Sequence, residues 1–161
     1  MITVRPAGAL DARAMAELLN AIIRKGGTTA RTAEIDRDTI LGWFEQAPGR
    51  AIWLVAEDET GNLWGFQSIE PHSKLPDNAC DIATFVRVGQ TGLGVGSKLF
   101  EQTKAAAVRL GYVWINATIR TDNDGGLAYY QSRGFEDYAR HANVALASGE
   151  IVGRISKRFD L

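Results

Sequence analysis

Three β-rich segments follow one another in the middle of the chain before any helix intervenes, and this order restricts the fold strongly. They cover residues 51–56, 63–69 and 80–88, and a helical pattern over 97–110 comes next. Strands joined by short turns pair antiparallel, whereas a strand that follows a crossover helix pairs in parallel. The order therefore predicts a mixed sheet with helices on its faces, not a regular alternation of strands and helices.

Hydrophobic periodicity extends this prediction over the whole chain, as a β-α-α-β-β-β-α-β-α-β-β order. The expected elements are 2–5, 10–23, 35–44, 51–56, 63–69, 80–88, 97–110, 112–119, 126–133, 135–146 and 151–159. Asp11 is a candidate N-cap for the first helix, whose apolar face would begin at Leu10. The fold class is α/β or α+β, in a single domain over 1–161 with about seven strands and about four helices.

Composition and charge narrow the classes of function. The chain has 18 Lys and Arg against 19 Asp and Glu, a net charge of −1, so nucleic acid and anionic membranes are not expected partners. No signal peptide is visible, and the longest apolar run, 51–56, is far below the ~20 residues that span a bilayer. Cys80 is the single cysteine, which favours a reducing, cytoplasmic compartment. The two histidines lack metal-ligand spacing, so no metal is expected.

A glycine-rich loop, Thr91-Gly92-Leu93-Gly94-Val95-Gly96-Ser97, lies between a predicted strand and a predicted helix. Free backbone N–H groups at such a helix start favour a phosphate or pyrophosphate. The dinucleotide and Walker patterns both fail, because Ser97 or Leu99 stands where a glycine is required. A nucleotide-binding domain is therefore disfavoured. A glycine-rich turn without any ligand remains an alternative.

A second motif follows about thirty residues later, as Asn123-x-x-Gly126-x-x-x-Tyr130-x-x-x-Gly134-Phe135. Together with Thr91-x-x-Gly94-x-Gly96, it resembles the GCN5-related N-acetyltransferase (GNAT) superfamily over nearly the whole chain. Residues 2–7, 53–58 and 157–159 resemble the phosphinothricin-type acetyltransferases within it. The resemblance implies the GNAT fold, acetyl-CoA as co-substrate and a homodimer, although no residue gives separate evidence for a dimer.

The resemblance also implies how coenzyme A would bind. The pyrophosphate would lie on the glycine loop, formed by Thr91, Gly92, Leu93, Gly94, Val95, Gly96 and Ser97. The family has Arg or Gln where this chain has Thr91, so we expect weaker coenzyme binding. The backbone of Val86, Arg87 and Val88 would pair with the pantetheine arm, beside a strand that separates from its neighbour. Asn123 would contact the coenzyme, but asparagine in this context is equally a turn former.

Two side chains match the family's catalytic positions. Tyr130 would protonate the leaving thiolate, and the alternative is a tyrosine that only packs on the sheet. Tyr129 points about 100° away around the helix, so both phenols cannot face one thiol. Asp81 matches a glutamate proposed as general base, acting directly or through a water, and the alternative is a solvated strand-end carboxylate. Cys80 is more typical of a buried apolar side chain than of an acyl carrier.

These residues predict an N-acetyltransferase that moves the acetyl group of acetyl-CoA directly to the primary amine of a small, possibly amino-acid-like acceptor. The alternative is a non-catalytic acyl-CoA-binding module that regulates a partner. Tyr130 and Asp81 favour the enzyme, because binding alone needs neither group. Walls of the acceptor site are expected from 25–35, 71–78 and 147–150, and His72 is a candidate lining residue.

Overall fold

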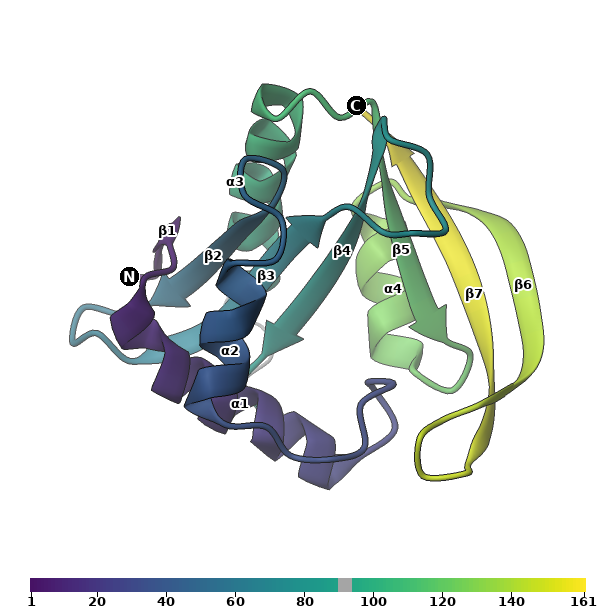
Figure 1. Cartoon of the computed structure of the whole chain (residues 1–161), viewed down its shortest axis with the longest axis horizontal. Helices are drawn as coiled ribbons and strands as arrows, with labels where there is room; N and C mark the ends of the chain where they lie inside the picture. Colours follow the sequence, from purple (N-terminus) through teal and green to yellow (C-terminus); the bar gives the residue numbers. More distant parts are fainter. Residues whose placement is uncertain (90–93) are drawn as a thin grey trace.

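The computed structural model describes residues 1–89 and 94–161 (Figure 1). Its elements are β1 (Thr3–Pro6), a 3-10 turn η1 (Ala9–Asp11), α1 (Ala12–Lys25), α2 (Arg37–Phe44), β2 (Ile52–Glu57), β3 (Leu63–Glu70), β4 (Ala79–Val86), α3 (Val95–Arg109), β5 (Trp114–Arg120), α4 (Asp124–Ser132), β6 (Glu136–Ala145) and β7 (Ile151–Asp160). The predicted order is confirmed. Because η1 precedes α1, Leu10 lies outside the helix and is fully exposed, so its assignment to the apolar face is wrong.

The seven strands form one mixed sheet in the order β1-β2-β3-β4-β5-β7-β6. Among the strand pairs of the described residues, only β4 and β5 are parallel, because α3 carries the chain across between them. They pair over three residues, the last pair being Asp81 with Asn116. β4 nevertheless continues along β3 as far as Val86 opposite Gly65. The predicted separation of neighbouring strands is therefore present, and it begins directly after Asp81.

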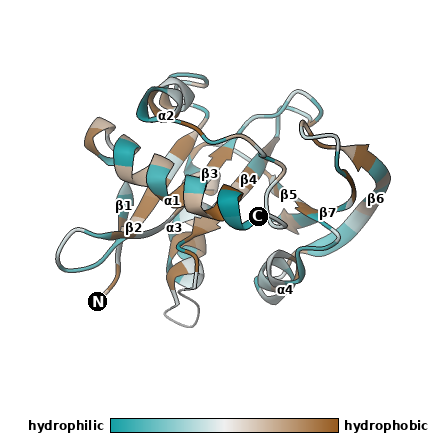
Figure 2. Ribbon diagram, turned by 90° about the horizontal axis from the view of Figure 1, so that it is seen from below, coloured by the Kyte–Doolittle hydropathy of each residue, from teal (hydrophilic) through white to brown (hydrophobic). Residues whose placement is uncertain are grey.

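Helices cover both faces of the sheet. Figure 2 shows α1 and α2 on one side and α3 and α4 on the other. Met15 and Leu19 of α1 are fully buried against Phe66 of β3, and Leu99 of α3 is fully buried on the opposite face. The core under α1 and α2 draws its strand residues from β2, β3 and β4, so the corresponding face of β5 and β7 is free to line a site. Among the described helices, none is both long and apolar enough to cross a membrane.

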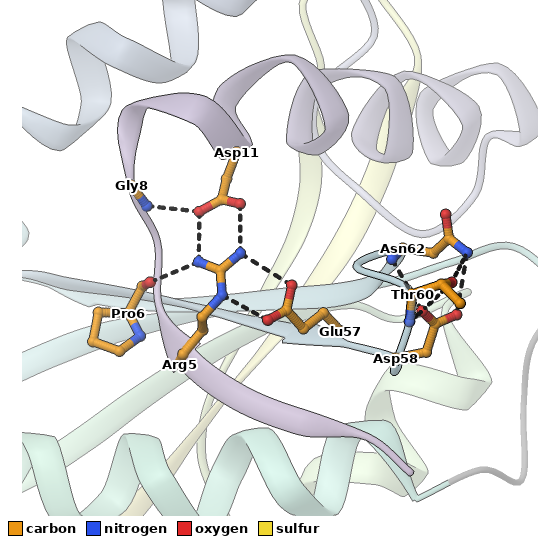
Figure 3. Close-up of polar contacts among 8 residues, drawn as sticks. All are labelled: Arg5, Pro6, Gly8, Asp11, Glu57, Asp58, Thr60 and Asn62. Carbon is orange, nitrogen blue, oxygen red and sulfur yellow. Dashed lines mark hydrogen bonds and ion pairs between the residues drawn. The ribbon is translucent and has the colours of Figure 1, made fainter.

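Arg5 joins the first strand to the start of α1 (Figure 3). Its Nε donates to Glu57 at 2.8 Å and its Nη2 donates to Asp11 at 2.8 Å. Asp11 also accepts a hydrogen bond from the backbone N–H of Gly8 at 2.7 Å. Asp11 therefore occupies the predicted N-cap position of α1, but its side chain makes no capping bond there. Its carboxylate is instead used by Arg5 and Gly8.

Candidate active site

A large cavity opens where β4 and β5 separate. Its volume is about 1760 Å³, above the ~300–1,000 Å³ of a typical small-molecule pocket, so it has room for two substrates. Every described residue of the predicted site lines it: Asp81, Val86, Arg87, Val88, Gly94, Val95, Gly96, Ser97, Asn123 and Tyr130. The predicted residues Thr91, Gly92 and Leu93 lie outside the described part of the chain. The fold thus gathers residues from four separate segments around one space.

The cavity is reached from both faces of the sheet. Side chains alternate along a strand, and the pairing of β4 with β3 assigns each residue to a face. Asp81 and Phe85 point to the side of α1 and α2, since Phe85 contacts Phe66 in that core. Thr84 points to the opposite side, where it meets Tyr130 of α4. Asp81 and Tyr130 therefore approach the same gap from opposite faces.

At the start of α3, which lines the cavity, backbone N–H groups have no hydrogen-bond partner among residues 1–89 and 94–161. Gly94 is its N-cap residue, with a left-handed φ of 72° and no side-chain capping bond. The first intrahelical bond runs from the N–H of Lys98 to the carbonyl of Gly94, so the N–H groups of residues 95–97 have no partner within the helix. Arg133, the residue that follows α4, donates a hydrogen bond to the hydroxyl of Ser97. Free donors, the helix dipole and a nearby guanidinium together form a site for an anion.

The two tyrosines of α4 have different partners. The Tyr130 phenol is buried and lies 2.7 Å from the Thr84 hydroxyl. Burial raises the pKa of Tyr130, so the phenol carries its proton at neutral pH. The Tyr129 hydroxyl donates to the carbonyl of Gly96 at 2.7 Å and accepts from Gln67 at 3.2 Å. Tyr129 therefore supports the start of α3, and Tyr130 is the phenol near the gap between the strands.

Asp81 is held at the last point where β4 and β5 pair. The side-chain Nδ2 of Asn116 donates to the Oδ1 of Asp81 at 2.8 Å, and the hydroxyl of Tyr138 in β6 donates in turn to the Oδ1 of Asn116. Burial raises the pKa of Asp81 and outweighs the hydrogen bond from Asn116, which lowers it. This environment is not that of a solvated strand-end carboxylate. It combines a fixed orientation with a raised proton affinity.

Comparisons with known proteins agree with this geometry. The family model described as Acetyltransferase (GNAT) family matches residues 13–135, which is more than half of the chain. The chain belongs to the GNAT family. It is an acetyl-CoA-dependent N-acetyltransferase, with acetyl-CoA as co-substrate. The match also confirms the GNAT fold and family expected from the two sequence motifs.

Individual relatives of this acetyltransferase cover nearly its full length. A Bacillus subtilis protein named "Putative phosphinothricin acetyltransferase YwnH" is 26% identical, over 99% of this chain and 95% of its own length. An L-methionine sulfoximine/L-methionine sulfone acetyltransferase of Salmonella typhimurium is 23% identical, over 92% of this chain and 88% of its own. A GNAT phosphinothricin acetyltransferase from Sinorhizobium meliloti, solved with acetyl-CoA, has a TM-score of 0.87 at 19% identity, over 99% of this chain and 88% of its own.

Asn123 of the acetyltransferase caps α4. Its Oδ1 accepts from the N–H of Gly126 at 2.9 Å, and its Nδ2 donates to the carbonyl of Thr28 at 3.2 Å. A Cβ on Gly126 would lie 2.4 Å from the Asn123 amide nitrogen, so this position of the Asn123 side chain favours glycine at 126. These bonds give Asn123 a role in local structure, and its contact with the coenzyme stays a prediction.

The three residues predicted to bind pantetheine differ in the direction in which their backbone N–H and C=O groups point. The N–H of Arg87 already donates to the carbonyl of Trp64 on the β3 side, at 2.8 Å. Its guanidinium also turns back, stacking over the Trp64 ring at 4.5 Å. Because backbone groups alternate in direction along a strand, those of Val86 face the free edge next to β5. Val88, which is partly exposed, follows in the turn after β4.

The acceptor walls are only partly those predicted. Residues from 25–31 and His72 line the cavity, as expected for two of the three regions. The turn at 147–150 does not contribute to the described lining, and residues of β6 such as Tyr138 and His141 take its place. Glu150 of that turn pairs instead with Arg120, which does line the cavity, at 3.3 Å.

Cys80 faces the core under α3 and α4, fully buried, and burial raises the pKa of its thiol to about 12. A thiol in this state is a poor nucleophile at neutral pH. Within residues 1–89 and 94–161, no group of three His, Cys, Asp or Glu side chains is arranged to hold a metal ion.

Sequence reasoning missed several side chains of the site: Ser68, Glu70, Thr84, Asn116, Arg133, Tyr138 and Arg154. Ser68 and Glu70 are two residues apart in a strand, which places them on one face of the sheet. That spacing was a usable signal. The side of the sheet that they face depends on strand pairing, which no local pattern in the sequence encodes.

Proposed function

We propose that this acetyltransferase moves the acetyl group of acetyl-CoA directly to the primary amine of a small, amino-acid-like acceptor. The observation that carries the proposal is the position of Asp81 and Tyr130, which enter one cavity from opposite faces of the sheet. A base on one side and an acid on the other suit a reaction in which one substrate loses a proton and the other gains one.

In the proposed reaction, the acceptor enters as an ammonium and gives a proton to Asp81, directly or through one water. The amine nitrogen then attacks the thioester carbonyl carbon, forming the C–N bond as the C–S bond breaks. Tyr130 gives its proton to the departing sulfur. The second proton that the nitrogen loses as the amide forms passes to solvent, solvent restores the phenol, and Asp81 releases its proton after product release. The raised pKa of Asp81 favours proton uptake, and the raised pKa of Tyr130 keeps its phenol protonated until charge develops on sulfur.

Coenzyme binding is assigned to the start of α3 and the free edge of β4. The N–H groups of residues 95–97 would bind the pyrophosphate, and the guanidinium of Arg133 would add a positive charge beside them. Arg133 thereby offsets the absence of the family's Arg or Gln at Thr91. The backbone of Val86 would pair with the pantetheine arm.

Two arginines support the proposal that the acceptor carries an acidic group. Arg31 and Arg154 line the cavity, and neither forms an ion pair within the described residues. The Nε of Arg154 is buried without a hydrogen-bond partner there. Guanidinium groups bind carboxylates well, and buried donors normally have partners. The Salmonella relative is also named for two amino-acid derivatives, L-methionine sulfoximine and L-methionine sulfone.

The test is amine-dependent release of thiol from acetyl-CoA, with a panel of amino acids and simple amines. The proposal expects turnover with at least one primary amine and a large loss in the Asp81→Asn variant. Tight binding of acetyl-CoA without thiol release for any amine would favour a non-catalytic acyl-CoA-binding module instead. The homodimer and the cytoplasmic location stay predictions.

A further inference from the structure

Glu70 and Asp81 stand directly opposite each other on β3 and β4, and both line the cavity. Residues in such a pair have Cβ atoms about 4.5–5.5 Å apart, and like charges there destabilise the sheet. Glu70 forms no ion pair and no side-chain hydrogen bond with any described residue, and the partner of Asp81 is the neutral amide of Asn116. The pair therefore lacks a cation in contact with it.

The charged and titratable groups around the pair do not supply that cation. Arg31 reaches over from the loop between α1 and α2, but its guanidinium stacks on the Trp43 ring at 4.3 Å. His72, just after β3, uses its Nδ1 to accept from the N–H of Lys74 at 3.1 Å. Burial, and after it the nearby Asp81, raise the pKa of Glu70, while the charges of Arg31 and His72 lower it without forming an ion pair with its carboxylate among the described residues.

Ser68 provides an independent observation at the same place. It lies two residues before Glu70, on the same face of β3, and is only 1% exposed. Ser68 is one of the residues that line the cavity, and its buried hydroxyl has no hydrogen-bond partner among the described residues. Its neighbour across the sheet is Ala83, whose small side chain leaves room beside Asp81. A buried hydroxyl normally has a partner, so this one points to a polar group of a ligand.

We propose that Ser68, Glu70 and Asp81 form an ammonium subsite that holds the acceptor amine, and that Glu70 makes the enzyme selective for charged primary amines. A primary ammonium has three N–H donors, and the subsite offers three oxygen-bearing groups to accept them. A secondary ammonium has two donors, and an aromatic amine is neutral near pH 7. The inference rests on the proposed function, because it assigns the amine to the Asp81 side of the cavity.

The subsite also accounts for product release. When Asp81 takes one proton and the nitrogen becomes an amide, the nitrogen loses its charge and two of its three N–H donors. Glu70 and Ser68 then have no ammonium to bind. The acetylated product is held less tightly than the acceptor, as turnover requires.

The experiment measures binding and acetylation of three probes that all carry a carboxylate: L-norleucine, N-methyl-L-norleucine and 4-aminobenzoate. Binding is measured by calorimetry on protein saturated with CoA, and acetylation by thiol release. Glu70→Gln keeps the shape of the side chain and removes its charge. Glu17→Gln, the same change on the exposed face of α1, is the matched control. Ser68→Ala is a second, smaller change within the subsite.

Glu70→Gln is expected to weaken L-norleucine binding roughly 10- to 100-fold, as for loss of a hydrogen bond to a charged group, and to leave 4-aminobenzoate unchanged. Ser68→Ala should weaken L-norleucine binding by a smaller factor, and Glu17→Gln should have no effect. Unchanged L-norleucine binding in Glu70→Gln, or an equal loss for 4-aminobenzoate, would overturn the subsite. If the wild type binds L-norleucine but neither these probes nor any primary amine of the panel is acetylated, the proposed function fails, while the binding comparison still decides the subsite.

Discussion

The phenol of Tyr130 lies 2.7 Å from the hydroxyl of Thr84, on the strand that has just separated from β5. α4 carries two tyrosines, and the hydroxyl of the other, Tyr129, is hydrogen-bonded to the start of α3. The bond to Thr84 therefore positions the hydroxyl of Tyr130 separately. Tyr130→Phe removes the acid and keeps the packing of the ring. Turnover is expected to fall roughly 10²-fold or more, with little change in the affinity for acetyl-CoA.

Tyr129→Phe is the matched comparison for that variant. It removes the bond to the Gly96 carbonyl, so the KM for acetyl-CoA should rise while turnover is largely retained. Steady-state kinetics of both variants separate the two roles. Wild-type turnover in Tyr130→Phe would mean that this tyrosine only packs on the sheet.

The pH dependence of kcat/KM reports on Asp81. Because burial raises the pKa of Asp81, kcat/KM should increase with pH, and the midpoint of this increase should lie above about 3.9, the ordinary pKa of aspartate. Asn116→Ala removes a hydrogen bond that favours the charged carboxylate, so the acid limb should move to higher pH. A limb that stays in place in Asn116→Ala would show that the titrating group is not Asp81.

Gly94→Val tests the anion site at the start of α3. A β-branched residue is strained at the φ of 72° that Gly94 adopts, so the donors of residues 95–97 would be displaced. Binding of coenzyme A should be lost. Gly111→Val places the same residue at a φ of 87° away from the cavity, so it should lower stability without lowering coenzyme affinity. Equal coenzyme affinity in both variants would contradict the assignment.

Arg133→Ala should raise the KM for acetyl-CoA, because the variant removes a positive charge beside Ser97. The effect should shrink at high salt, as expected for an exposed charge acting on an anion. Arg109→Ala, at the other end of α3, is the control for the change in net charge. The assignment of Arg133 is refuted if the two variants have the same KM.

Arg5 makes the free energy of unfolding depend on pH in the acidic range. It lowers the pKa of both Asp11 and Glu57. A carboxyl with a lowered folded pKa stabilises the fold above its unfolded pKa, and this is lost as the pH falls through the folded pKa. The free energy of unfolding of the wild type, measured with urea, should therefore fall below about pH 4. Arg5→Met should make this free energy less dependent on pH. Arg24→Met, which breaks an exposed pair with Glu34, should leave the dependence unchanged.

The fold was predictable because its signals are local. Helix and strand periods, and glycines at helix ends, define each element without knowledge of its neighbours. The order of elements then fixed the mixed sheet, and the motif spacing pointed to Asp81 and Tyr130. The assignment of Leu10 to the apolar face of the first helix was wrong, because Leu10 lies in a short 3-10 turn that precedes α1.

The rest of the site depends on pairing between distant segments. The register of β3 on β4 places Glu70 opposite Asp81, and the register of β4 on β5 brings Asn116 to the same carboxylate. Tyr138 reaches Asn116 across β7, which lies between β5 and β6. A slip of one residue in any of these pairs would turn the side chains to the other face. Local patterns do not specify that choice.

The most direct test of direct acetyl transfer is a single turnover with enzyme in excess over carbon-13-labelled acetyl-CoA, in the presence of an accepted amine. Mass spectra of the intact protein and of the small molecules would locate the label. The account predicts that the label passes to an amide of the amine while the protein mass never changes. Label on the protein during turnover, at Cys80 or elsewhere, or no labelled amide from any primary amine, would contradict it.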